Sequence, residues 1–218
     1  MGVPVLIMGP SGSGKSTSLR NFRPDEIGVF NVSGKPLPFK GIFPFAHIEQ
    51  ASAIKAAMGK GTRRAYVIDD AQYIMGFAEM DTKLTGYDKW NRIGYDFIDL
   101  VRSISNLPPN TVAYFMMHTE MGDDGRIKAK TLGKLIDNHY TLEGLFPVVL
   151  LCGSTKTEHW FETETDGSNT VKSPIGMFDS PRIDNDLKLV DTKLRDYWGL
   201  APLVDKVNEE DKKKEQDA

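Results

Sequence analysis

The stretch that decides the fold reads Val3-Pro-Val-Leu-Ile-Met8, then Gly9-Pro10-Ser11-Gly12-Ser13-Gly14-Lys15-Ser16-Thr17. Its first six residues are apolar and predict a β-strand. The residues from Gly9 to Ser16 match G-x-x-x-x-G-K-[ST] in full, and they predict a glycine-rich turn that leads into a helix. A strand, a turn and a helix in succession form the setting in which this motif binds phosphate.

The glycine-rich turn suits a polyphosphate, a multiply charged anion that needs many hydrogen-bond donors. Glycines let backbone N–H groups curl around an anion, and a helix N-terminus adds partial positive charge. We expect Lys15 to reach the β- and γ-phosphates of ATP and the Ser16 hydroxyl to ligate Mg²⁺. The alternative is a turn that ends in Lys-Ser by coincidence. The candidate nucleotide-binding residues are Gly9, Pro10, Ser11, Gly12, Ser13, Gly14, Lys15, Ser16 and Thr17.

The composition is typical of a globular protein. The chain has 218 residues, of which 40% are hydrophobic, and its formal net charge is −3. No apolar run has the length of a membrane span, and the single cysteine, Cys152, excludes an intrachain disulfide. We therefore expect a cytoplasmic protein that binds no membrane, with one domain over residues 1–200. Residues 201–218 end in a charge run and predict a disordered tail.

A second motif lies at Ala65-Tyr-Val-Ile-Asp69-Asp70. An apolar strand that delivers an acid at its end, about fifty residues after such a turn, is a Walker B pattern. Asp69 is expected to lie near Ser16 and hold Mg²⁺, and Asp70 to orient or deprotonate the attacking water. Gln72 and Tyr73 follow directly and could position the second acid.

The rest of the chain alternates apolar strands with amphipathic helices, which predicts an α/β fold with a mainly parallel central sheet. Residues 159–165 and 170–174 predict an antiparallel β-hairpin with a four-residue turn at the edge of this sheet. We expect Asp184 or Asn185 to cap the last helix. Further strands are expected at residues 27–32, 111–118 and 147–152, and helices at 17–22, 48–58, 73–85, 90–107, 132–140 and 184–198.

Two features follow the strand that ends at residue 118. His118 leaves the sheet at its C-terminal edge, where it could sense the γ-phosphate or merely satisfy a backbone carbonyl. The glycine-containing segment 121–134 then carries several cations and predicts either a solvated hairpin or a loop that binds a phosphate backbone. Its candidate nucleic-acid-binding residues are Arg126, Lys128, Lys130 and Lys134.

Taken in order, these segments and Thr170-Val-Lys172-Ser-Pro-Ile-Gly-Met-Phe178 resemble a RecA-like ATPase core, within the wider group of AAA and RecA P-loop NTPases. Three segments are similar to sequences in small ATP-binding proteins of tailed bacteriophages, some of which act in single-strand annealing and recombination: Asp69-Asp-Ala-Gln-Tyr73, Lys130-Thr-Leu-Gly-Lys134 and Ile183-Asp-Asn-Asp-Leu187. The resemblance implies ATP hydrolysis with Mg²⁺, binding of single-stranded DNA, and a homo-oligomeric ring or filament. It also implies that Lys172 reaches the nucleotide of a neighbouring subunit. The alternative is that Lys172 is a solvated lysine on an edge strand, which would give the same sequence pattern.

The chain departs from the RecA pattern at one catalytic position. RecA-type enzymes have a catalytic glutamate after the strand next to the P-loop strand, whereas that strand here ends at Val32-Ser33-Gly34. The water-activating role then moves to Asp70, as in AAA-type ATPases, which leaves both assignments open. Two other functions stay open. One is a non-catalytic nucleotide-dependent adaptor. The other is a nucleoside or nucleotide kinase, which would need a lid with several arginines to bind phosphates, whereas the candidate loop here has one, Arg126.

Overall fold

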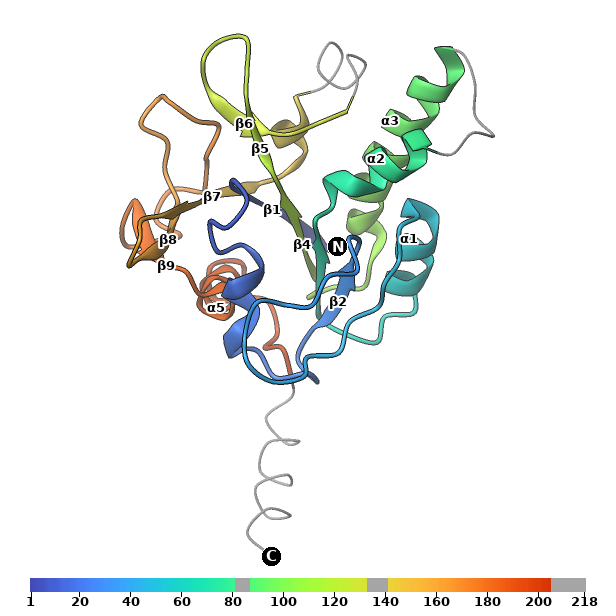
Figure 1. The fold of residues 1–218 in the computed structure, drawn as a ribbon. Coiled ribbons are helices and arrows are strands. Elements are labelled where there is room, and N and C mark those ends of the chain that lie inside the picture. The colour runs from blue at the N-terminus through green and yellow to red at the C-terminus, as the bar shows by residue number, and fades with distance from the viewer. Residues whose placement is uncertain (81–86, 133–140, 205–218) are drawn as a thin grey trace, which may run out of the picture.

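A seven-stranded sheet forms the centre of the computed structural model, which describes residues 1–80, 87–132 and 141–204 (Figure 1). The strand order is β2-β3-β4-β1-β7-β8-β9; the first five strands are parallel, and β8 and β9 extend one edge in antiparallel fashion. The strands are β1 (Val3–Met8), β2 (Gly28–Asn31), β3 (Ala65–Asp69), β4 (Val112–Met117), β7 (Val148–Ser154), β8 (His159–Glu162) and β9 (Arg182–Asp184).

Helices cover both faces of this sheet. One face carries α1 (Ala51–Gly59), α2 (Gln72–Met80), α3 (Tyr87–Ser103) and the 3₁₀-helices η2 (Ile104–Asn106) and η3 (Leu142–Leu145). The other carries the 3₁₀-helix η1 (Ser16–Asn21) and α5 (Leu187–Trp198). A separate hairpin, β5 (Thr119–Met121) and β6 (Ile127–Ala129), projects from the end of β4 (Figure 1). Within the described ranges, no helix is both long and apolar enough to cross a bilayer.

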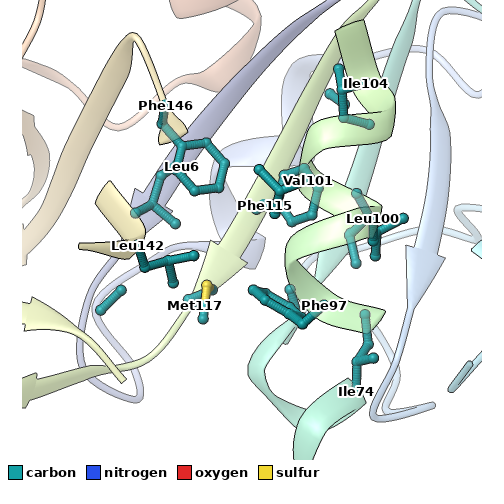
Figure 2. Close-up of a cluster of buried hydrophobic side chains, with 14 of the residues drawn as sticks. Leu6, Ile74, Phe97, Leu100, Val101, Ile104, Phe115, Met117, Leu142 and Phe146 are labelled. Carbon is teal, nitrogen blue, oxygen red and sulfur yellow. The ribbon is translucent and has the colours of Figure 1, made fainter. Parts of the chain in front are cut away.

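The central strands bury apolar side chains on both faces, as their continuous apolar sequences predict. In β1, Leu6 and Met8 pack beneath α1 to α3, whereas Val5 and Ile7 pack beneath η1 and α5. Figure 2 shows the first of these clusters, in which α3, η2 and β4 meet through Phe97, Val101, Ile104, Phe115 and Met117. The predicted α/β fold and its mainly parallel sheet are thus confirmed.

The antiparallel edge is also confirmed, but the predicted hairpin within residues 159–174 is wrong. Strand β8 pairs with β7 and β9. Residues 168–170 instead hydrogen-bond to Ile127, and Lys172 forms a bridge with Val149. The turn at 166–169 does form, and its Asp166 carboxylate accepts from the Ser168 backbone N–H. The segments on either side of this turn, however, pair with other parts of the chain.

The N-terminal cap of α5 differs from the one that the sequence predicts. The cap of α5 is Asp186, whose carboxylate accepts from the backbone N–H groups of Lys188 and Leu189, so the expected caps Asp184 and Asn185 are wrong. Gly199 ends this helix in the left-handed region at φ 62°. Most of the helix expected at 132–140 and of the tail expected at 201–218 lies outside the described residues.

A buried ion pair attaches α5 to the sheet. Arg195 Nε donates to Asp191 Oδ2 at 2.6 Å, and the Tyr114 hydroxyl donates to Asp191 Oδ1 at 2.7 Å. Burial raises the pKa of Asp191, and the Arg195 guanidinium opposes that rise. The same guanidinium also donates to three backbone carbonyls, those of Arg64, Asn110 and Ala201. It thereby joins the C-terminal end of α5 to the loops before β3 and β4.

We expect Arg195→Ala to lower the free energy of unfolding by about 3–5 kcal/mol, because it leaves a buried carboxylate and three carbonyls without their partner. The matched control is Arg92→Ala, which removes an exposed pair with Asp96 four residues away and is expected to cost less than about 1 kcal/mol. Urea unfolding monitored by circular dichroism measures both changes. Equal costs for the two variants would contradict a structural role for the buried pair.

Candidate functional site

Three parallel strands bring the predicted site residues to one edge of the sheet. Strand β4 lies between β1 and β3, with Met8 paired to Met117 and Ile68 to Phe115. The glycine-rich turn after β1, the acids after β3 and His118 after β4 therefore meet at the carboxyl ends of the strands. In open α/β sheets, ligands bind outside these ends where the strand order reverses, as it does around β1.

The glycine-rich turn, residues 9–15, has a backbone that needs its glycines. Gly12 and Gly14 lie in the left-handed region at φ 78° and 104°. A side chain on Gly9 would place its Cβ 2.5 Å from Ser13 Oγ and 2.9 Å from Cys152 Cβ. In the described part of the chain, the Gly14 and Lys15 backbone N–H groups and the buried Ser13 hydroxyl have no hydrogen-bond partner. The turn therefore presents unpaired donors, as an anion site requires.

Lys15 lies over this turn. Its Nζ donates to the backbone carbonyls of Gly9 at 2.8 Å and Pro10 at 3.0 Å, and its side chain is buried. Burial lowers the pKa of Lys15, whereas the nearby Cys152, Asp70 and Asp69 raise it. The ammonium group is thus held beside the unpaired backbone donors, where it adds positive charge to them.

The hydroxyl of Ser16 donates to Asp69 Oδ1 at 2.9 Å, although the two residues are 53 positions apart. This contact joins the start of η1 to the end of β3, as the sequence predicted. Asp69 is buried, and burial, with a smaller effect of the neighbouring Asp70, raises its pKa to about 6.

Asp70 faces His118, and Gln72 supports the pair. His118 Nε2 lies 3.2 Å from Asp70 Oδ1, and Gln72 Oε1 accepts from the His118 backbone N–H. Burial, with the Lys15 ammonium, lowers the pKa of His118, so a neutral imidazole faces the carboxylate. Asp70 adopts a left-handed φ of 58°, which is uncommon outside glycine.

The donor set fits Mg²⁺ with a nucleotide. A hydroxyl and a carboxylate oxygen lie side by side at Ser16 and Asp69, and Mg²⁺ typically uses one or two such protein ligands together with phosphates and waters. Among residues 1–80, 87–132 and 141–204, no group of three or more His, Cys, Asp or Glu side chains forms an all-protein metal cage.

No protein-family model matches the chain, and no curated protein is similar to it in sequence.

Three of the four predicted nucleic-acid residues, Arg126, Lys128 and Lys130, lie on the β5–β6 hairpin or just after it. Two of them have acidic partners: Arg126 Nε lies 2.7 Å from Asp124 Oδ2, and Lys128 Nζ lies 3.5 Å from Glu120 Oε1. Lys130 lines a pocket of about 170 Å³ together with Gln72, Tyr73 and His118. Lys134 is outside the described residues.

Lys172 lies beside β7, apart from the other predicted site residues of this chain. Its backbone exchanges two hydrogen bonds with Val149 of β7, at the level of Leu6 in β1, and its side chain is exposed. Among the described residues it has no hydrogen bond or ion pair with the glycine-rich turn. A contribution of Lys172 to a neighbouring subunit stays a prediction.

No pattern in the sequence indicates that His159 and Asn185 pack against the glycine-rich turn, or that Arg20 of η1 holds Asn185. His159 Nδ1 lies 2.9 Å from the Ser13 carbonyl oxygen. The Asn185 side chain lies against Gly14, and Arg20 Nη1 donates to the Asn185 carbonyl. These contacts arise from β8 and the chain before α5, and no local pattern marks them.

The raised pKa of Asp69 predicts that the ionised Asp69 carboxylate lowers the free energy of unfolding. Because its folded pKa is about 6 and its ordinary value is 3.8, stability from this carboxyl is fully present below pH 3.8 and is lost as the pH rises through about 6. We expect the isosteric Asp69→Asn to raise the free energy of unfolding at pH 7.5 by about 1–3 kcal/mol. The gain should disappear near pH 4.

Urea unfolding at both pH values, without nucleotide or Mg²⁺, tests this expectation. Asp99→Asn is the control, because Asp99 forms an exposed pair with Lys55 and its loss should change stability little. A destabilised Asp69→Asn protein at pH 7.5 would show that the ionised carboxylate contributes favourably to the fold.

Proposed function

We propose that this chain binds ATP with Mg²⁺ through residues 9–17 and hydrolyses it. The observation that carries the proposal is the 2.9 Å contact between Ser16 Oγ and Asp69 Oδ1, next to the unpaired N–H groups of the glycine-rich turn. It joins a phosphate-binding motif to a strand-end acid across the sheet, which is the arrangement that P-loop NTPases use for metal and phosphate.

Each residue of the site has a role in this proposal. The backbone N–H groups of Gly14 and Lys15 bind phosphate oxygens, and the Lys15 ammonium neutralises the β- and γ-phosphates. Ser16 and Asp69 hold Mg²⁺, which neutralises charge on the phosphates when bound. Asp70 orients the attacking water and accepts its proton, while His118 positions the Asp70 carboxylate.

The resemblance to RecA-like phage ATPases supports a wider role in DNA recombination, annealing or replication. The β5–β6 hairpin is linked to the site, because the Lys130 backbone N–H donates to the His118 carbonyl at 2.7 Å. Single-stranded DNA bound along the hairpin would therefore lie next to the side chain that positions Asp70. Arg126 and Lys128 form ion pairs with acids of the hairpin, whereas Lys130 lines a pocket together with His118.

Phosphate release from ATP, measured with and without single-stranded DNA, tests the proposal. We expect turnover that requires Mg²⁺ and rises with DNA. Flat, very low turnover together with tight ATP binding would instead indicate a nucleotide-dependent adaptor, and transfer of the phosphate to a nucleoside would indicate a kinase.

A further inference from the structure

His159, at the start of β8, holds the outer side of the glycine-rich turn. Its Nδ1 lies 2.9 Å from the Ser13 carbonyl oxygen. Because a carbonyl only accepts, this contact is a hydrogen bond when Nδ1 carries its hydrogen. Residues 13 and 159 are 146 positions apart, so the antiparallel edge of the sheet reaches back to the turn at the end of β1.

The contact determines where the next backbone donor points. The Ser13 carbonyl and the Gly14 N–H belong to one planar trans peptide, so they point in opposite directions. With the carbonyl directed towards His159, the Gly14 N–H is directed away from β8. There it has no partner in the described part of the chain, and neither has the following N–H of Lys15.

The outer side of Gly14 is closed by side chains. A Cβ on Gly14 would lie 3.0 Å from His159 Nδ1 and 3.2 Å from both polar side-chain atoms of Asn185. Asn185 is itself buried, and Arg20 holds its carbonyl. His159 and Asn185 therefore block an anion from approaching Gly14 on their side, and the unpaired Gly14 N–H is directed away from β8.

We propose that His159 is a positioning residue for polyphosphate binding, which it supports by holding the Ser13–Gly14 peptide with its N–H towards the phosphates. The inference rests on the proposed ATP-binding function. Without this hydrogen bond, the peptide is free to rotate and present the Ser13 carbonyl to the anion, which repels it. His159 itself contacts the turn and not the phosphates.

Three substitutions at His159 separate this role from simple packing. In His159→Asn the amide nitrogen is bonded to Cγ, as Nδ1 is, so it can donate to the same carbonyl. In His159→Gln the amide nitrogen is one bond further from the backbone, and His159→Ala has no donor. We expect His159→Asn to keep ATP–Mg²⁺ affinity within about twofold of wild type, and the other two to lose about fivefold to tenfold, the worth of one hydrogen bond.

Isothermal titration with ATP–Mg²⁺ and with inorganic pyrophosphate measures these effects, with His47→Ala as a control because His47 pairs with Glu49 away from the turn. The losses should be equal for both ligands, since they arise in the phosphate cradle. A loss with ATP alone would assign His159 to the base or sugar and overturn the inference. Unchanged affinity in His159→Ala, or a His159→Asn as weak as His159→Ala, would also overturn it.

The outcomes keep the two proposals apart. A wild-type protein that binds neither ATP nor pyrophosphate contradicts the proposed function itself. A wild-type protein that binds both, with variants that bind equally well, contradicts only the role of His159. Thermal unfolding of each variant shows whether a lower affinity reflects a loss of fold, and His159→Asn repeats the test with a side chain of similar shape.

Discussion

Asp70→Asn is expected to lower ATP turnover by about two to four orders of magnitude, which is the contribution typical of a general base. The substitution removes the basic oxygen and keeps the shape of the side chain. Asparagine also tolerates the left-handed φ of 58° at this position, and its carbonyl oxygen can still accept from His118 Nε2. The fold and the affinity for ATP should therefore be preserved, and the variant should trap bound ATP.

Single-turnover phosphate release and an ATP-binding titration on the same protein separate these two effects. The matched variant is Asp69→Asn. It is expected to weaken the dependence of ATP turnover on Mg²⁺, because Asp69 accepts a hydrogen bond from Ser16, the other expected Mg²⁺ ligand. If Asp69→Asn traps ATP and Asp70→Asn changes the Mg²⁺ dependence, the roles of the two acids are reversed. Normal turnover in Asp70→Asn would remove it from the chemistry.

The central part of the fold could be predicted because its signals are local. The apolar run at residues 3–8, the glycine spacing that follows and the apolar run before Asp69 each predict one element without reference to the rest of the chain. Parallel strands then place their ends at one edge, so the contact between Ser16 and Asp69 follows from the order of the motifs.

The strand pairing within the antiparallel edge could not be predicted in the same way, because strand partners are chosen over long distances. Residues 159–174 have the alternation and the turn of a hairpin, yet β9 takes the place of the expected second strand. At Gly153 any side chain would collide with the Trp160 indole, so β8 packs closely on β7. The contact of His159 with the turn depends on this pairing and had no signal in the sequence.

Lys15 is the residue on which the proposed function depends most. Its ammonium lies beside the unpaired donors of the turn and is already held by two backbone carbonyls, so little side-chain freedom is lost when it turns to a phosphate. The ammonium is expected to form a charged hydrogen bond with each of the β- and γ-phosphates, and such bonds are worth about 1.5–3 kcal/mol each, so its loss should weaken ATP–Mg²⁺ binding at least about a hundredfold.

Equilibrium titration of ATP–Mg²⁺ into the wild type, Lys15→Ala and Lys15→Met tests the central claim most directly. Lys15→Met keeps most of the buried volume and removes the charge, so it separates binding from folding, and thermal unfolding checks that both variants are folded. We predict saturable binding by the wild type and a loss of at least about a hundredfold in both variants. ATP affinity equal to that of the wild type in folded Lys15→Ala and Lys15→Met would contradict the claim that residues 9–17 bind the nucleotide.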